Sequence, residues 1–201
     1  MIRYTMRAAD VRFLGPGNRA ALWVHGCPRA CEGCIASDMN RSSDYSEETP
    51  EALADWFLST GADGLTLSGG EPFAQAGALT DLIRLIRNRR PQVSVIVYTG
   101  YTRDELTDPD YCALLSETDL LIDGPYLREQ DSGRFAVGSD NQRIHLLTRR
   151  IPEEIAARYY RTDKARQVEL RQQSGSIQLI GVPNRQHLNV WNTLKEVYRH
   201  G

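Results

Sequence analysis

The spacing of the cysteines constrains this chain more than any other feature of its sequence. Three of the four cysteines, Cys27, Cys31 and Cys34, lie within eight residues of one another, and Cys112 is far from them. Clustered thiols in a reducing compartment are typical metal ligands rather than disulfide partners. The spacing Cys-x3-Cys-x2-Cys differs from the paired Cys-x2-Cys of most zinc sites. It favours three ligands for a [4Fe–4S] cluster whose fourth iron stays open to another ligand.

On spacing alone, one other metal site stays open. His25 could complete a three-cysteine zinc site, although it lies so close to Cys27 that the geometry is difficult. Cys112 stands in an apolar, helix-like stretch with Leu114 and Leu115, which predicts a buried residue and not a ligand. Both interpretations leave the cysteine loop as the centre of the chemistry.

Composition and charge are those of an ordinary globular protein. The chain has 201 residues, of which 41% are hydrophobic and 25% charged, and a formal net charge of -2. This length suits one domain, and the charge gives no basic field that attracts nucleic acid. No run approaches the roughly 18 apolar residues that span a membrane, and the N-terminus lacks the apolar core of a signal peptide. We therefore expect a cytoplasmic protein that binds neither nucleic acid nor membrane.

Apolar periodicity predicts an α/β fold in which strands alternate with helices. The expected strands are residues 19–25, 64–68, 93–97, 119–123, 143–147 and 176–180, and the expected helices are 50–60, 76–90, 111–116, 153–165 and 186–199. Thr49 and Pro50 are typical of a helix start. The alternation and the near-continuous apolar strands favour parallel βαβ units. About six strands suit a partial, open barrel rather than a closed barrel of eight.

Glycine-rich and polar segments follow these strands directly. The cysteine loop follows the first, Gly69-Gly70-Glu71 the second, Thr99-Gly100 the third and Asp123-Gly124 the fourth. Parallel strands end at the same edge of a sheet, and the chemistry of such folds collects there. We expect all four segments to face one rim.

These motifs resemble those of the radical S-adenosylmethionine superfamily. The cysteine spacing resembles the cluster signature, and Leu67–Pro72 resembles the GGEP motif that holds the methionine amino group. Many members carry an aromatic residue just before the third cysteine. This chain has Gly33 there, which resembles the branch that activates glycyl-radical enzymes. Further segments are similar to the activating proteins of anaerobic ribonucleotide reductases, and they extend the resemblance over roughly residues 12–147. These segments are Gly15–Arg19, Leu22–Cys27, Tyr98–Tyr101, Leu121–Tyr126 and Gly138–Ile144.

The resemblance implies a radical SAM core, a partial (βα)6-type open barrel of mostly parallel strands. It implies a [4Fe–4S] cluster on Cys27, Cys31 and Cys34, and S-adenosylmethionine chelated to the open iron. One electron then yields a 5′-deoxyadenosyl radical that abstracts hydrogen from a glycine of a partner enzyme. Beyond the ligands of the cluster and the cofactor, no catalytic residue is expected. The residues expected to bind S-adenosylmethionine are Gly69, Gly70, Glu71, Pro72, Thr99 and Asp123.

The implied partner is a larger glycyl-radical enzyme such as an anaerobic ribonucleotide reductase, with an electron donor such as flavodoxin or ferredoxin. Residues 1–201 are expected to form one domain, with a C-terminal extension from about residue 149 that matches less specifically. The segment Gly138–Ile144 and the arginine-rich stretch 149–171 are candidates for the docking rim. Alternatives are a minimal radical enzyme acting on a small molecule or peptide, an iron–sulfur electron-transfer or sensor protein, and a zinc-stabilised binding module.

Overall fold

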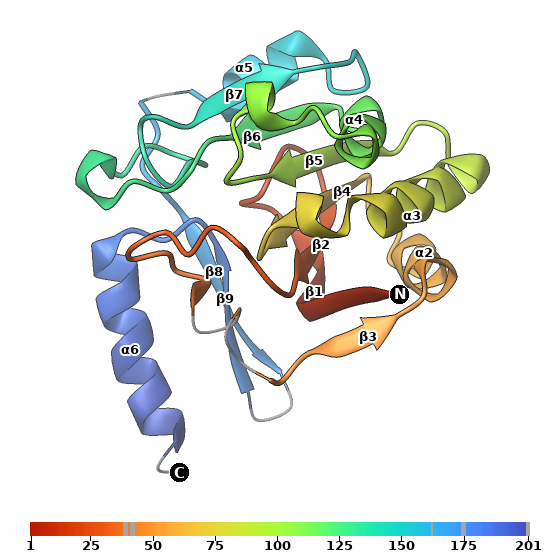
Figure 1. The fold of residues 1–201 in the computed structure, drawn as a ribbon. Helices are drawn as coiled ribbons and strands as arrows, with labels where there is room; N and C mark the ends of the chain where they lie inside the picture. Colours follow the sequence, from red (N-terminus) through yellow and green to blue (C-terminus); the bar gives the residue numbers. More distant parts are fainter. Residues whose placement is uncertain (38–39, 41–42, 162, 174–175, 200–201) are drawn as a thin grey trace.

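The computed structural model of the protein describes residues 1–37, 40, 43–161, 163–173 and 176–199. Within these residues a seven-stranded sheet has the order β3-β1-β2-β4-β5-β6-β7, and a two-stranded hairpin, β8-β9, stands apart from it (Figure 1). The strands are β1 (Ile2–Val11), β2 (Arg19–Val24), β3 (Ser46–Glu48), β4 (Gly64–Gly69), β5 (Ser94–Tyr98), β6 (Leu120–Asp123), β7 (Arg143–Leu146), β8 (Val168–Gln173) and β9 (Ser176–Gly181). The helices are α2 (Pro50–Ser59), α3 (Ala76–Arg89), α4 (Pro109–Ser116), α5 (Glu153–Tyr159) and α6 (Arg185–Arg199), with short 3-10 helices η1 (Pro72–Gln75), η2 (Arg103–Glu105) and η3 (Arg128–Gln130).

The centre of the sheet is parallel, as the sequence predicts. Strands β2, β4, β5 and β6 pair side by side in the same direction, with Leu22 opposite Leu67 and Val97 opposite Leu121. Their side chains are buried on both faces, and α2, α3 and α4 cover one of these faces with the main apolar core. Strands β3 and β7 end the sheet, so among the described residues it stays open. The prediction of an open α/β fold is confirmed.

The first helix of the core begins where the sequence places it. The Thr49 side chain accepts a hydrogen bond from the Ala52 amide, and Pro50 occupies the first turn, where its missing N–H costs nothing. The apolar side chains Leu53 and Phe57 are buried against the sheet. Local capping and periodicity therefore suffice to define this element.

The edges of the sheet depart from the expected parallel pattern. Strand β1 has no counterpart in the prediction, because its polar and charged residues interrupt any apolar run, and it pairs antiparallel with β2. Strand β7 pairs antiparallel with β6. A parallel pairing needs a crossover that is usually a helix, whereas only the short η3 lies between β6 and β7. The chain therefore turns back after β6.

The C-terminal residues cover the other face of the sheet. Ile180 of β9 is fully buried with Ala21 and Trp23 of β2, and Ile151 and Ala156 pack with Ile96 of β5 and its neighbours. Figure 1 shows β8, β9 and α6 on the side of the sheet opposite α2 and α3. In the described part of the chain, no helix is long and apolar enough to cross a membrane.

Candidate active site at the carboxyl edge of the sheet

The cysteine loop and the Gly69-Gly70-Glu71 turn lie in direct backbone contact. The Gly70 amide donates to the Val24 carbonyl at 2.7 Å, and the Glu71 amide donates to the Gly26 carbonyl at 2.8 Å. A Cβ on Gly70 would lie 2.1 Å from the Gly26 oxygen, so no larger residue fits there. Gly69 has φ +96°, a conformation that favours glycine. The two glycines thus let the ends of β2 and β4 meet.

In the cysteine loop, Cys27 and Cys31 both act electrostatically on Cys34. The loop turns through positive φ values at Gly26, Ala30 and Gly33, and all three cysteines are half-buried and free. Burial raises the pKa of the Cys34 thiol, and the neighbouring Cys31 and Cys27 raise it further. Among the described residues no set of three or more acidic, histidine or cysteine side chains has metal-binding geometry in this conformation. The donor chemistry, three free thiols on one glycine-containing loop, fits an iron–sulfur cluster.

The two other residues weighed as metal ligands lie elsewhere. The ring of His25 stacks on Tyr45, with the ring centroids 4.5 Å apart and 14° between the planes. Cys112 is exposed, and its thiol donates to the Leu106 carbonyl at 3.6 Å. The expectation that Cys112 is buried was wrong, because the apolar face of the short α4 is carried by Leu114 and not by the cysteine.

Glu71 joins the end of β4 to the end of β5. Its carboxylate is 1% exposed and accepts hydrogen bonds from the Phe73 amide at 3.0 Å, the Thr99 hydroxyl at 2.8 Å and the Gly100 amide at 2.8 Å. Burial raises the pKa of Glu71, and these hydrogen bonds oppose the rise. Glu71 and Thr99, predicted separately, therefore form one buried network beside the cysteine loop.

Asp123 belongs to the same rim but engages different partners. One carboxylate oxygen accepts from the Arg103 amide at 2.6 Å, and the other lies 3.1 Å from the His145 Nε2 atom. Both oxygens are thus directed to the segment after β5 and to β7. The structure brings the cysteine loop, Gly69–Pro72 and Thr99 together. Asp123 is connected to them through the Arg103 amide and through the Thr99 amide, which donates to the neighbouring Ile122 carbonyl at 2.9 Å.

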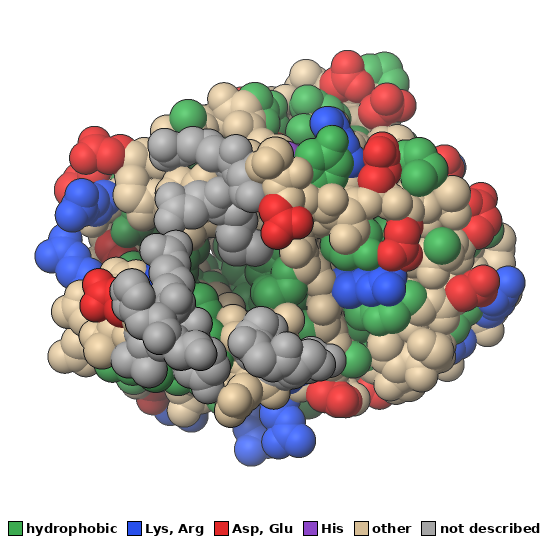
Figure 2. Space-filling view, turned by 90° about the horizontal axis from the view of Figure 1, so that it is seen from below, with side chains coloured by type: hydrophobic (Ala, Val, Ile, Leu, Met, Phe, Trp, Pro, Cys, Tyr) green, Lys and Arg blue, Asp and Glu red, His purple; other side chains and the backbone are tan. Residues whose placement is uncertain are grey.

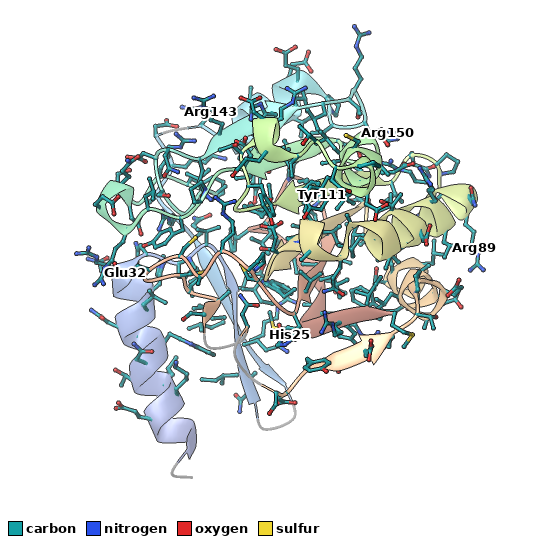
Figure 3. The ribbon with its side chains drawn as sticks, in the orientation of Figure 1. His25, Glu32, Arg89, Tyr111, Arg143 and Arg150 are labelled. Carbon is teal, nitrogen blue, oxygen red and sulfur yellow. The ribbon has the colours of Figure 1, made fainter. Side chains whose placement is uncertain are left out.

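A cavity of about 500 Å³ opens beside Cys31. Most of the other residues that line it were not predicted from the sequence. Gly33 leaves room for the segment after β6, since a Cβ there would lie 3.3 Å from Arg128. Figure 3 shows Glu32, at the tip of the loop, close to the first turn of α6. Only the Leu121–Tyr126 motif gave a signal for this segment. The residues that line the cavity are Cys31, Glu32, Pro125, Tyr126, Leu127, Arg128, Glu129 and Arg185.

Comparisons with known proteins identify the family of this chain. Residues 13–145 match the family described as a 4Fe-4S single cluster domain. The chain is 35% identical to the anaerobic ribonucleoside-triphosphate reductase-activating protein of Vibrio cholerae, over 67% of this chain and 91% of that protein. The protein of the same name from Enterobacteria phage T4 is 31% identical, over 65% and 85% of the two chains. Among solved structures, QueE from Escherichia coli overlaps 50% of this chain and 53% of its own, with 14% identity and a TM-score of 0.41.

These similarities define a radical S-adenosylmethionine enzyme with an iron–sulfur centre. The chain belongs to the family of anaerobic ribonucleoside-triphosphate reductase-activating proteins. A [4Fe–4S] cluster and S-adenosylmethionine are its cofactors.

Proposed function

We propose that this protein generates a glycine-centred radical in a larger partner, an anaerobic ribonucleoside-triphosphate reductase. The observation that carries the proposal is the backbone contact of 2.8 Å between Glu71 and Gly26, which joins the cysteine loop to the Gly-Gly-Glu turn. Such a junction supports the proposal because it would bring the thiolate ligands next to a buried acceptor for an ammonium group. The names of the relatives supply the partner class.

Two groups of residues would hold the cofactors. Cys27, Cys31 and Cys34 would ligate the cluster, and Gly69–Pro72 with Thr99 would hold the methionine part of S-adenosylmethionine. When both are bound, one electron passed to S-adenosylmethionine supplies a 5′-deoxyadenosyl radical that can take a hydrogen atom from a glycine. An electron donor such as flavodoxin or ferredoxin completes the proposal.

The side chains of this rim would orient the methionine part of S-adenosylmethionine. Glu71 sits in a dry position where a charge-assisted hydrogen bond to an ammonium group is strong, and its three present donors hold the carboxylate in place. Thr99 would act through Glu71. Asp123 would act at a distance, by holding the Arg103 amide and with it the loop that carries Gly100.

The cavity beside Cys31 is our candidate for the position of the partner's glycine loop. It borders a cluster ligand directly, and its walls come from the cysteine loop, the segment after β6 and α6. The arginine-rich stretch 149–171 presents fewer unpaired charges to a docking partner than its sequence suggests. Four of its six arginines form ion pairs within the chain: Arg150 with Asp119, Arg161 with Asp163, Arg166 with Asp131 and Arg171 with Glu169. Arg185 and Arg128, whose 3.9 Å pair with Glu32 is highly exposed, are further docking candidates at the cavity.

Electron paramagnetic resonance after anaerobic mixing tests the function. The reconstituted protein, a strong reductant, S-adenosylmethionine and the reductase encoded with it should together give a glycine-centred doublet on the reductase. Cys27→Ala should give none, whereas Cys112→Ala should behave like the natural chain. Full turnover triggered by a small molecule without the reductase would replace this proposal with the small-molecule alternative.

A further inference from the structure

Arg29 extends from the cysteine loop to the end of β5. Its Nη1 lies 3.4 Å from Glu105 Oε1, and its guanidinium lies 4.8 Å from the centroid of the Tyr101 ring. The Arg29 side chain is 24% exposed, and its charge also acts on the Glu71 carboxylate. One residue between two cluster-binding cysteines therefore contacts the loop after β5 at two points.

Gly100 provides the room for this contact. A Cβ at position 100 would lie 2.7 Å from Arg29 Cδ, in the middle of the arginine stem. The φ angle of Gly100 is not among the positive values that require glycine elsewhere in the chain. A larger residue at this position would therefore have to displace the Arg29 side chain.

Few other side chains hold the cysteine loop in place after Gly26. Among the ion pairs of the described residues, the loop 27–35 makes one more, between Glu32 and Arg128 at 3.9 Å, with side chains 90% and 59% exposed. Pairs as exposed as this one contribute little. The partly buried Arg29, with a planar cation over an aromatic ring, is the stronger connection.

We propose that Arg29 is a positioning residue that clamps the cysteine loop onto the rim at Gly100, Tyr101 and Glu105. The clamp would hold Cys27 and Cys31 beside Glu71 before any cofactor binds, which reduces the ordering cost of cluster assembly and of S-adenosylmethionine binding. This role rests on the proposed function for its purpose, and on the contacts of Arg29 for its existence.

Thiol alkylation of the anaerobic, metal-free protein tests the clamp directly. Iodoacetamide labelling followed by peptide mass spectrometry gives separate rates for the loop cysteines, with the exposed Cys112 as internal reference. Arg29→Ala should raise the rates at Cys27 and Cys31 about tenfold relative to Cys112, the size expected when a cation–π contact and a partly exposed ion pair are lost together. Arg29→Lys should fall between, because it keeps the charge and loses the planar stack.

Gly100→Ala should reproduce the effect from the other side of the contact, and should add little in the Arg29→Ala background. Arg89→Ala is the matched control. Arg89, at the end of α3, pairs with Asp55 of α2 on a surface distant from the cysteine loop, and both side chains are 65% exposed (Figure 3). Unchanged alkylation rates in both Arg29→Ala and Gly100→Ala would overturn the proposal.

A second measurement separates this inference from the proposed function. In the reconstituted protein, Arg29→Ala should retain iron, bind S-adenosylmethionine about tenfold more weakly by calorimetry and broaden the paramagnetic signal of the reduced cluster. Arg29→Lys should restore most of the affinity. If the natural chain takes up no iron, the proposed function fails while the alkylation rates still decide the role of Arg29. If the natural chain binds both cofactors and Arg29→Ala binds S-adenosylmethionine equally well, the clamp has no role in cofactor binding.

Discussion

The region of residues 13–145 and the extension of residues 149–199 differ in the contacts that hold them in the fold. In the first region, β4, β5 and β6 are buried on both faces and bond to each other through regular backbone ladders. In the second, hydrogen bonds from long polar side chains add to the apolar contacts that Ile180, Ile151 and Ala156 make with the sheet. Arg171 donates to the carbonyls of Ala9 and Asp10, and Leu170 is 50% exposed. Seen from below in Figure 2, hydrophobic side chains of the molecule lie at the bottom of a hollow in the surface.

The second region joins the two sides of the open sheet. Near β1, the Tyr159 hydroxyl accepts from the Gly15 amide at 2.9 Å, and Glu169 accepts from the Arg12 amide at 2.8 Å. Beyond β6, the buried Arg166 pairs with Asp131 and donates to the Gly138 carbonyl at 2.7 Å. We infer that residues 13–145 carry the chemistry and that the extension from about residue 149 closes the same single domain. Experiments on each region test this division of roles.

The largest expected effect is the loss of the cluster. Cys27→Ala, Cys31→Ala or Cys34→Ala should abolish the visible chromophore of the anaerobically reconstituted protein, because three thiolates are the minimum that the loop offers. Cys112→Ala should retain about four irons per chain. Absorption spectra and iron analysis measure both. Stoichiometric zinc in the natural chain under the same conditions would remove the iron–sulfur assignment.

The next largest effect lies in the extension. Arg166→Met removes one partner of a buried ion pair and leaves Asp131 without its cation, which should lower the free energy of unfolding by about 3–5 kcal/mol. Denaturant unfolding measures the change. The matched control is Arg161→Met, which removes an exposed pair with Asp163 and should change stability by at most about 1 kcal/mol. Loss of the cluster from a still folded Arg166→Met protein would contradict the division of roles.

A smaller effect is expected for the buried carboxylate of the rim. Glu71→Ala should keep the cluster and weaken S-adenosylmethionine binding by about one to two decades, because a charge-assisted hydrogen bond contributes roughly 1.5–3 kcal/mol. Thr99→Val removes only one of the donors to Glu71 and should cost less. Calorimetry on the anaerobic protein gives both dissociation constants. Equal constants in all three proteins would reduce the Gly-Gly-Glu turn to a structural element.

The smallest effect is a pH dependence with opposite signs in the two regions. Burial raises the pKa of Glu71 above its ordinary 4.5, so its contribution to stability is fully present below that value and is lost as the pH rises through the higher, folded-state pKa. The stability of the natural metal-free chain relative to Glu71→Gln should therefore fall as the pH rises above 4.5. A hydrogen bond from Arg161 lowers the pKa of the exposed Asp163, and that contribution is instead lost as the pH falls. Urea unfolding at several pH values compares the natural chain with Glu71→Gln and Asp163→Asn; a relative stability of Glu71 that rises with pH would contradict this sign.

The sequence by itself determined the elements whose signals are local. Thr49 and Pro50 mark the start of α2 because capping involves only neighbours in the chain. The apolar runs of β4, β5 and β6 predicted parallel strands, and the glycine-rich turns after them predicted a common rim. The cysteine spacing indicated the cluster for the same reason, since its three donors lie within one loop.

Only the tertiary structure decided the features that depend on distant residues. The directions of β1 and β7 follow from pairing and from the lack of a crossover helix. The Glu71 carboxylate turns to Thr99 because β4 and β5 end side by side. Arg29 and Arg166 pair with residues far away in the chain, so no local pattern predicts their contacts. Their partners Glu105 and Asp131 lie 76 and 35 residues away, and folding alone brings such groups together.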